Sequence, residues 1–319
     1  MTAPEIPHSV DAHPHGLHVI DTGFVGPHMA AAYLLVEQGR GAFVETGTAR
    51  SVPRLLEALE GAGLDRGDVD YVIVTHVHLD HAGGAGALMQ HLPNARFVVH
   101  PRGARHMIDP AKLIAGAVAV YGEATFEKNY DTVVPIPAER VVEAPEGHEV
   151  ELAGRKLRFL DTPGHAYHHF CVHDPAARAV FTGDTFGLSY RQLDTDAGPF
   201  IFPTTTPVHF DPEAMHRSVD RLASLDPAQM NLTHYGPVAF DGRLVSDLHH
   251  GVDSLVELAR AHADEDDRHA AIQAAVTDYL VARLRAHGSE KPEAELRAFL
   301  EMDADLNAQG LVVWLDRNG

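Results

Sequence analysis

The sequence contains a single cysteine, Cys171, which excludes an internal disulfide framework and fits a reducing compartment. No stretch approaches the roughly 20 consecutive apolar residues that a bilayer-spanning helix needs. The first residues also have neither the basic start nor the apolar run of a secretion signal. We therefore expect a cytoplasmic protein that has no membrane partner.

Basic residues are scarce as well. The chain has 25 Lys and Arg against 45 Asp and Glu, a formal net charge of −20. Such a charge repels a phosphate backbone, and no Lys/Arg-rich run offers a local exception, so we expect no nucleic-acid partner. Histidine is abundant, with 24 copies in 319 residues. Most of these are expected to be ordinary surface or core residues, so only their positions can single out ligands.

Short apolar segments separated by turns predict a layered α/β fold. We expect strands over 17–21, 31–37, 42–46, 71–75, 96–100, 149–152, 156–161, 168–173, 179–184 and 230–234. Helices are predicted after Ser51, after Asp211, and over most of 101–137.

The strands end before about residue 246, and the rest of the chain has a helical pattern. One helix should end at Gly288, and two shorter ones should cover 292–301 and 306–315. We therefore predict an α/β domain over 1–245, with a helical insertion at about 101–137, and a helical extension over 246–319.

The stretch "THVHLDHAGG", residues 75–84, follows an apolar strand and concentrates polar side chains in one turn. Alternate residues of an extended segment share a face, so His76 and His78 can bind one metal ion. Asp80 and His81, beyond the bend, can turn toward a second. Imidazoles with a carboxylate suit zinc, iron or manganese better than calcium or magnesium.

Three other predicted strand ends carry the residue types that would complete such a site. They are His165 in "DTPGHAYHH", Asp184 in "FTGDTFG" and His234 in "LTHYGP". Loops that leave strand ends commonly carry functional residues, so convergence at one edge is expected.

This ordered set resembles the metal-binding signature of the metallo-β-lactamase superfamily, over about residues 15–245. The resemblance implies a four-layer αββα sandwich with two divalent transition-metal ions at one edge. His76, His78 and His165 would hold the first ion, Asp80, His81 and His234 the second, and Asp184 would bridge them. By the same resemblance, Glu45 and His169 would contact the metal ligands and orient them, although Glu45 stands where many members have aspartate. For His169, simple packing of a strand residue near the site is an open alternative.

The resulting prediction is a metallo-hydrolase that uses a dinuclear-metal-bound hydroxide on a small ester, thioester or lactone, with zinc as the first choice of metal. Asp80 would be the catalytic residue. Two alternatives stay open: iron-dependent oxygen or sulfur chemistry, as in persulfide dioxygenases or oxygen-binding diiron proteins, and a non-catalytic metal-binding regulatory protein.

The segments that the superfamily core does not contain are predicted to narrow the access to the metal site. We expect residues 104–130 and the tail after 246 to flank the metals, with Tyr190 and Tyr121 contacting the substrate. For both tyrosines, packing in the core is an open alternative. For the tail, a homodimer contact is an open alternative. Cys171 is predicted to be a buried structural thiol.

Overall fold

The computed structural model describes residues 10–205 and 208–318, which divide into two compact units. The first unit holds the chain up to Asp161, together with His168–Gly183 and Ala228–Pro237. The second unit holds Thr162–Tyr167, Asp184–Pro227 and the chain from Val238 onward. These units do not divide at residue 245, because residues 184–227 group with the C-terminal helices. The two predicted domains stay a prediction.

A seven-stranded sheet forms one layer of the first unit, and its strands are ordered as in the sequence. The strands are β1 (Val10–His13), β2 (Leu17–Asp21), β3 (Ala31–Glu37), β4 (Arg40–Val44), β5 (Val69–Ile73), β6 (Arg96–Val99) and β7 (Val141–Glu143). The first four form an antiparallel meander, and β4 to β7 run parallel. Parallel neighbours place the carboxyl ends of β5 and β6 at the same edge of the sheet.

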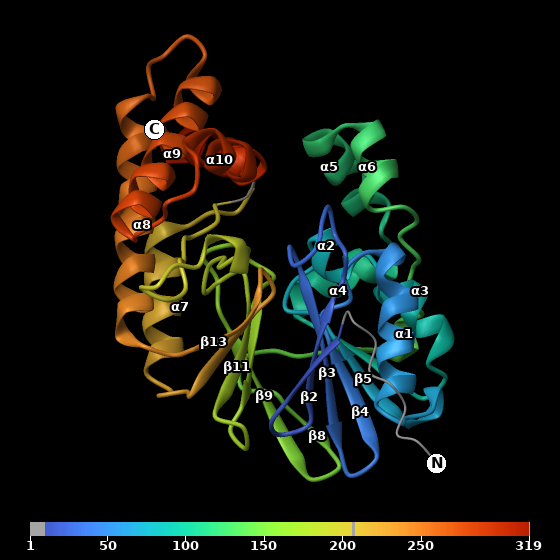
Figure 1. Ribbon diagram of the computed structural model, residues 1–319. Helices are drawn as coiled ribbons and strands as arrows, with labels where there is room; N and C mark the ends of the chain where they lie inside the picture. Colours follow the sequence, from blue (N-terminus) through green and yellow to red (C-terminus); the bar gives the residue numbers. More distant parts are fainter. Residues whose placement is uncertain (1–9, 206–207, 319) are drawn as a thin grey trace. The chain divides into compact units, whose positions relative to one another are not determined.

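Helices cover the outer face of this sheet (Figure 1). They are α1 (Val52–Gly61), α3 (Ala85–His91) and α4 (Pro101–Ile108). The helix predicted after Ser51 is confirmed as α1, and its Leu55 and Leu59 are buried in the core that also contains Met107 of α4. Burial of each such side chain contributes about 1.5–3 kcal/mol.

A second, six-stranded sheet packs against the inner face of the first. Its order is β13 (Gly236–Ala239), β12 (Gln229–Leu232), β11 (Ala179–Gly183), β10 (Phe170–Asp174), β9 (Arg155–Asp161) and β8 (Glu149–Leu152). Between the sheets, the Tyr33 ring meets Phe181 edge-on at 5.1 Å, and the Tyr33 hydroxyl donates to the Leu232 carbonyl. The predicted α/β sandwich is confirmed.

The stretch predicted to be mostly helical, 101–137, contains α4, α5 (Ala111–Tyr121) and α6 (Glu123–Asn129). Phe126 and Tyr130 pack with Leu79 of the short helix α2 (Leu79–Ala82) and with Phe24. The side of α2 that carries Leu79 is therefore covered by this helical stretch. Short 3₁₀ turns complete the described elements: η1 (Ala49–Ser51), η2 (Arg66–Asp68), η3 (Ala138–Arg140) and η4 (Arg191–Leu193).

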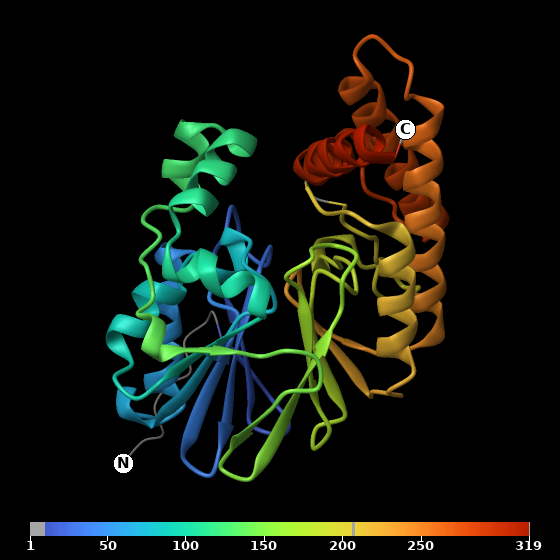
Figure 2. The same cartoon turned by 180° about the vertical axis from the view of Figure 1, so that it is seen from behind.

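The second unit is mainly helical, with α7 (Pro212–Ala223), α8 (Gly242–Ala261), α9 (Arg268–Ala286) and α10 (Glu293–Asn318). The last three pack side by side, as the orange and red ribbons of Figure 2 show. Asp211 caps α7 as predicted, because its side chain accepts from the Ala214 amide. Among the described residues, every helix is too short or too polar to cross a bilayer.

One predicted helix boundary in the tail is wrong. The sequence led us to expect separate helices over 292–301 and 306–315, whereas α10 is continuous. No glycine or proline interrupts residues 302–305, so the backbone hydrogen bonds continue through them. The predicted stop before Gly288 is confirmed, since α9 ends at Ala286.

Candidate metal centre

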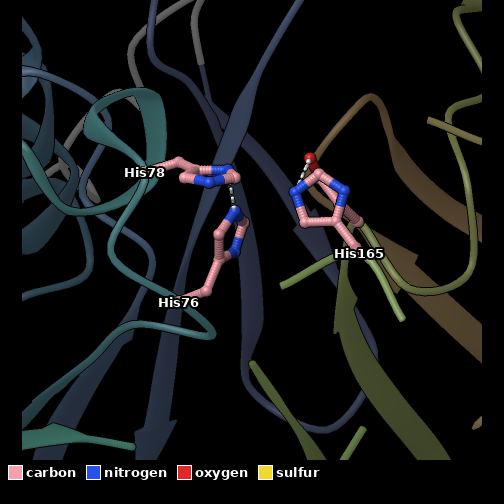
Figure 3. Close-up of side chains that lie close together, drawn as sticks. His76, His78 and His165 are labelled. Atoms are coloured by element: carbon pink, nitrogen blue, oxygen red, sulfur yellow. Dashed lines mark hydrogen bonds and ion pairs between the residues drawn. The ribbon is translucent and has the colours of Figure 1, made fainter. Parts of the chain in front are cut away.

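The stretch "THVHLDHAGG" (75–84), called the motif below, lies where β5 ends and the chain leaves the sheet. His78 occupies the N-cap position of α2, and Asp80 and His81 lie within that helix. The ring nitrogens His76 Nε2 and His78 Nδ1 lie 2.8 Å apart (Figure 3). Two imidazoles two residues apart therefore converge, as the alternation of an extended segment predicts.

A second group in the same unit combines the motif with the end of β12. Asp80, His81 and His234 each offer a ligand atom, and these atoms all lie within 4.8 Å of one another. Asp80 Oδ2 lies 3.5 Å from His81 Nε2 and 3.2 Å from His234 Nε2. His81 is fully buried and His234 is nearly so. The structure thus brings together the three residues that the sequence assigned to one metal ion.

The tautomers of these histidines indicate what the group can hold. His234 Nδ1 lies 2.7 Å from the Met29 carbonyl, which can only accept, so this nitrogen carries the proton. His81 Nδ1 lies 3.5 Å from the Glu45 carboxylate. Both Nε2 atoms therefore direct lone pairs toward the Asp80 oxygen. Imidazole lone pairs that face a carboxylate at this distance suit a cation bound between them. In metal-ligating histidines, the other ring nitrogen typically faces a carbonyl or a carboxylate, as Nδ1 does in both of these residues.

Glu45 also connects this group to the pair His76 and His78, through Thr75. The carboxylate is 1% exposed and accepts hydrogen bonds from the Thr75 amide, at 3.2 Å, and from the Thr75 hydroxyl. Since the hydroxyl donates to Glu45, it accepts from His76 Nδ1, 3.1 Å away. His76 Nε2, the nitrogen beside His78, is thereby left to bind a cation. Glu45 thus orients histidines of both groups.

The second unit, described by itself, contains another histidine and carboxylate that lie close together. His165 Nε2 lies 3.4 Å from Asp184 Oδ2, and both residues are buried. On the opposite side of the ring, His165 Nδ1 lies 3.4 Å from the Thr204 carbonyl. The arrangement repeats that of His234: Nδ1 faces a carbonyl, and Nε2 faces a carboxylate.

A glycine directly precedes each of these two residues. Gly164 has φ of +137°, and a Cβ there would lie 2.5 Å from the Met215 Cα. Gly183 has φ of +49°, and a Cβ there would lie 2.4 Å from the Thr75 hydroxyl oxygen and 2.5 Å from His169 Nε2. Any other residue would displace its neighbours, so close packing explains the glycines in "PGH" and "TGD".

Two adjacent histidines, His168 and His169, lie beside the motif. His169 is fully buried and stacks on His76, with ring centroids 4.9 Å apart. His168, which the sequence reasoning missed, meets His78 edge-on at 5.6 Å. The pair "HH" was the available signal.

The two tyrosines considered for substrate contact both lie in packed surroundings. Tyr190 is 1% exposed, its ring meets Phe299 edge-on at 5.4 Å, and its hydroxyl donates to Asp303 on α10 at 3.1 Å. This burial does not support the predicted substrate contact, because the ring is part of the packing within the second unit.

Tyr121 packs 5.4 Å from Tyr130, which belongs to the same buried cluster as Leu79. Burial, then Tyr121 and the Asp80 carboxylate, raise the pKa of the Tyr130 phenol well above its usual range. Cys171 is fully buried, and its thiol donates to the Thr182 carbonyl at 3.4 Å. The predicted burial of this thiol is confirmed.

Comparison with known proteins identifies the family. A model of the "Metallo-beta-lactamase superfamily" matches residues 25–234. The chain is 28% identical over 233 residues to the metallo-beta-lactamase fold-containing protein ST1585 of Sulfurisphaera tokodaii, covering 70% of this chain and 80% of that protein. A hydroxyacylglutathione hydrolase of Acidiphilium cryptum is 30% identical over 261 residues, covering 81% and 77%.

The fold agrees with this assignment. A crystal structure of ST1585, from Sulfolobus tokodaii, matches with a TM-score of 0.65 at 23% identity, covering 94% of this chain and 99% of that one. The chain belongs to the metallo-β-lactamase superfamily. Together with the histidine and aspartate cluster, membership implies that the protein binds divalent metal ions.

Proposed function

We propose that the protein is a metal-dependent hydrolase of a small thioester, ester or lactone. The observation that carries the proposal is the common orientation of His81, His165 and His234. In each, Nδ1 faces a carbonyl or carboxylate, and Nε2 faces an aspartate oxygen. Histidines that only pack in a core do not need this shared arrangement. Metal ligands do need it, because it fixes which ring nitrogen is free to bind the ion.

We assign the ligands by the order of the family signature. His76, His78 and His165 would hold one ion, and Asp80, His81 and His234 the other, with Asp184 shared between them. The donor set of imidazoles and carboxylates fits zinc, our first choice, and also fits iron or manganese. When bound, such ions lower the pKa of water toward neutrality and polarise a carbonyl oxygen.

The chain's own residues supply the remaining parts of the reaction. Asp80 offers one oxygen to the two histidines, and we assign it the orientation of the attacking water. It would accept a proton from that water and return it to the departing thiolate or alkoxide. Glu45 holds His81 and, through Thr75, His76 in position. Leu79, which directly precedes Asp80, packs with Tyr130 in an apolar cluster that would restrict water near Asp80.

A thioester is the preferred substrate class among the three. The relative that is 30% identical is named a hydroxyacylglutathione hydrolase, and an acyl-glutathione is a thioester. A thiolate is also the best leaving group of the three classes, so its departure needs the least assistance from a proton donor. A small molecule, rather than a nucleic acid, also fits the net charge of −20. We place the activity in the cytoplasm.

The test is a substrate panel with the zinc-loaded protein. Acyl-glutathione thioesters, aryl esters, acyl-homoserine lactones and phosphodiesters would be compared by kcat/KM. We expect hydrolysis of a carbonyl substrate, thioesters first, and a loss of on the order of 10²–10⁴ in Asp80→Asn. His91→Ala, an exposed histidine on α3, is the control. Cleavage of phosphodiesters alone, or full activity in Asp80→Asn, would contradict the proposal.

A further inference from the structure

Another histidine pair lies between α7 and α8, within the second unit. His216 of α7 and His249 of α8 stack with ring centroids 4.8 Å apart and an interplanar angle of 23°. Their Nδ1 atoms lie only 2.5 Å apart. Each helix also carries an aspartate four residues further on, Asp220 and Asp253, which lies on the same face as its histidine.

The two aspartates pair with the histidines crosswise. His216 Nε2 lies 3.0 Å from Asp253 Oδ1, and His249 Nε2 lies 2.8 Å from Asp220 Oδ1. A carboxylate only accepts, so each Nε2 carries a proton and donates it. In the neutral rings both Nδ1 atoms are then unprotonated. Two lone pairs would face each other at 2.5 Å, an arrangement that repels unless a positive charge lies between them.

We propose that His216 and His249 form a binding site for a divalent transition-metal ion that joins α7 to α8. Neutral imidazole nitrogens are the ligands that copper, nickel and zinc prefer, with copper bound most tightly. Carboxylates that hold the opposite nitrogens favour this protonation state of the rings and raise their basicity. Both histidine side chains are 27% exposed, so water can complete the coordination.

The geometry needs only a small adjustment. Two nitrogens at about 2.0–2.1 Å from a tetrahedral ion lie about 3.3 Å apart, so the rings must separate by slightly less than 1 Å. Partly exposed side chains on a helix surface can move by this amount. The site shares no residue with the hydrolase centre, so it does not depend on the proposed function.

Copper uptake by the zinc-loaded, full-length protein tests the site. Cu²⁺ would be added in increments, with bound copper and retained zinc measured by elemental analysis after gel filtration. We expect one Cu²⁺ per chain without loss of zinc, and an electron paramagnetic resonance spectrum with coupling to two imidazole nitrogens. Because an ion that binds the folded state stabilises it, the melting temperature should rise with Cu²⁺.

The variants His216→Gln and His249→Gln should each weaken copper binding at least tenfold and remove the rise in melting temperature. Asp220→Asn should weaken it by a smaller factor. His250→Gln, the exposed neighbour of His249, is the matched control and should bind as the parent does. If the parent binds no copper while its zinc stays in place, the two rings share a proton instead and the proposal is wrong. Equal binding by His216→Gln would also overturn it.

Discussion

The Glu45 carboxylate lies 3.5 Å from Nδ1 of His81, inside the first unit, where both side chains are almost completely buried. The same carboxylate accepts from Thr75, whose hydroxyl lies 3.1 Å from His76 Nδ1. One acidic side chain thus orients a histidine in each of the two groups. Its loss should weaken metal binding without removing a ligand.

We therefore predict that Glu45→Gln lowers zinc affinity about 10–100-fold, the usual cost of losing such a supporting contact. Competition with a chromophoric chelator measures the change. Glu57→Gln, which makes the same substitution at an exposed position of α1, should bind zinc as the parent does. Unchanged affinity in Glu45→Gln would show that the carboxylate does not support the ligands.

His165→Ala should cost one metal ion preferentially. His165 is assigned to the first ion with His76 and His78, whereas the ligands of the second ion remain. Elemental analysis should therefore give about one ion per chain instead of two, and His91→Ala should keep both. A His165→Ala protein that retains both ions and full activity would show that the ligand assignment is wrong.

Asp184→Ala should reduce the occupancy of both ions, because a carboxylate shared by two cations offsets part of their repulsion. Metal binding stabilises the folded state, so the melting temperature of the zinc-loaded variant should fall. After removal of zinc by a chelator, the parent and the variant should melt at nearly the same temperature.

The comparison of the two melting temperatures without zinc separates metal loss from misfolding. A variant that melts lower even without zinc would indicate a structural role for Asp184 instead of a bridging one. Asp266→Ala, at an exposed position, controls for the removed charge.

Tyr190→Phe should change stability and leave catalysis alone. The variant leaves the buried Asp303 without the donor that now lies 3.1 Å away, at a cost of about 1–3 kcal/mol in the free energy of unfolding. Urea unfolding measures the loss, and KM for the best substrate should be unchanged. A raised KM with unchanged stability would restore the substrate contact that the sequence suggested.

Much of this molecule could be predicted because its patterns are local. The apolar run before "THVHLDHAGG" predicts β5, and the strand ends at His165, Asp184 and His234 predict the ligand types. The short strands β1, β7 and β13 were missed, since three or four residues with mixed burial give too little alternation to detect.

Other features depend on partners that are distant in the sequence. Tyr190 and Asp303 are 113 residues apart, so nothing near Tyr190 indicates that its hydroxyl is occupied. His216 and His249 are 33 residues apart and meet only because α7 packs on α8. The continuity of α10 differs from the predicted pair of helices for a local reason, because no glycine or proline separates the two predicted ranges.

The most direct test of the hydrolase assignment is metal content measured together with activity. The protein would be purified without added metal, stripped with a chelator and reloaded with zinc, and ions per chain and thioester hydrolysis would be followed at each step. The account predicts about two ions per chain at the proposed centre, loss of hydrolysis on stripping, and its recovery as the second ion returns. Full hydrolysis by the stripped protein, or two bound ions with no hydrolysis of any carbonyl substrate, would contradict it.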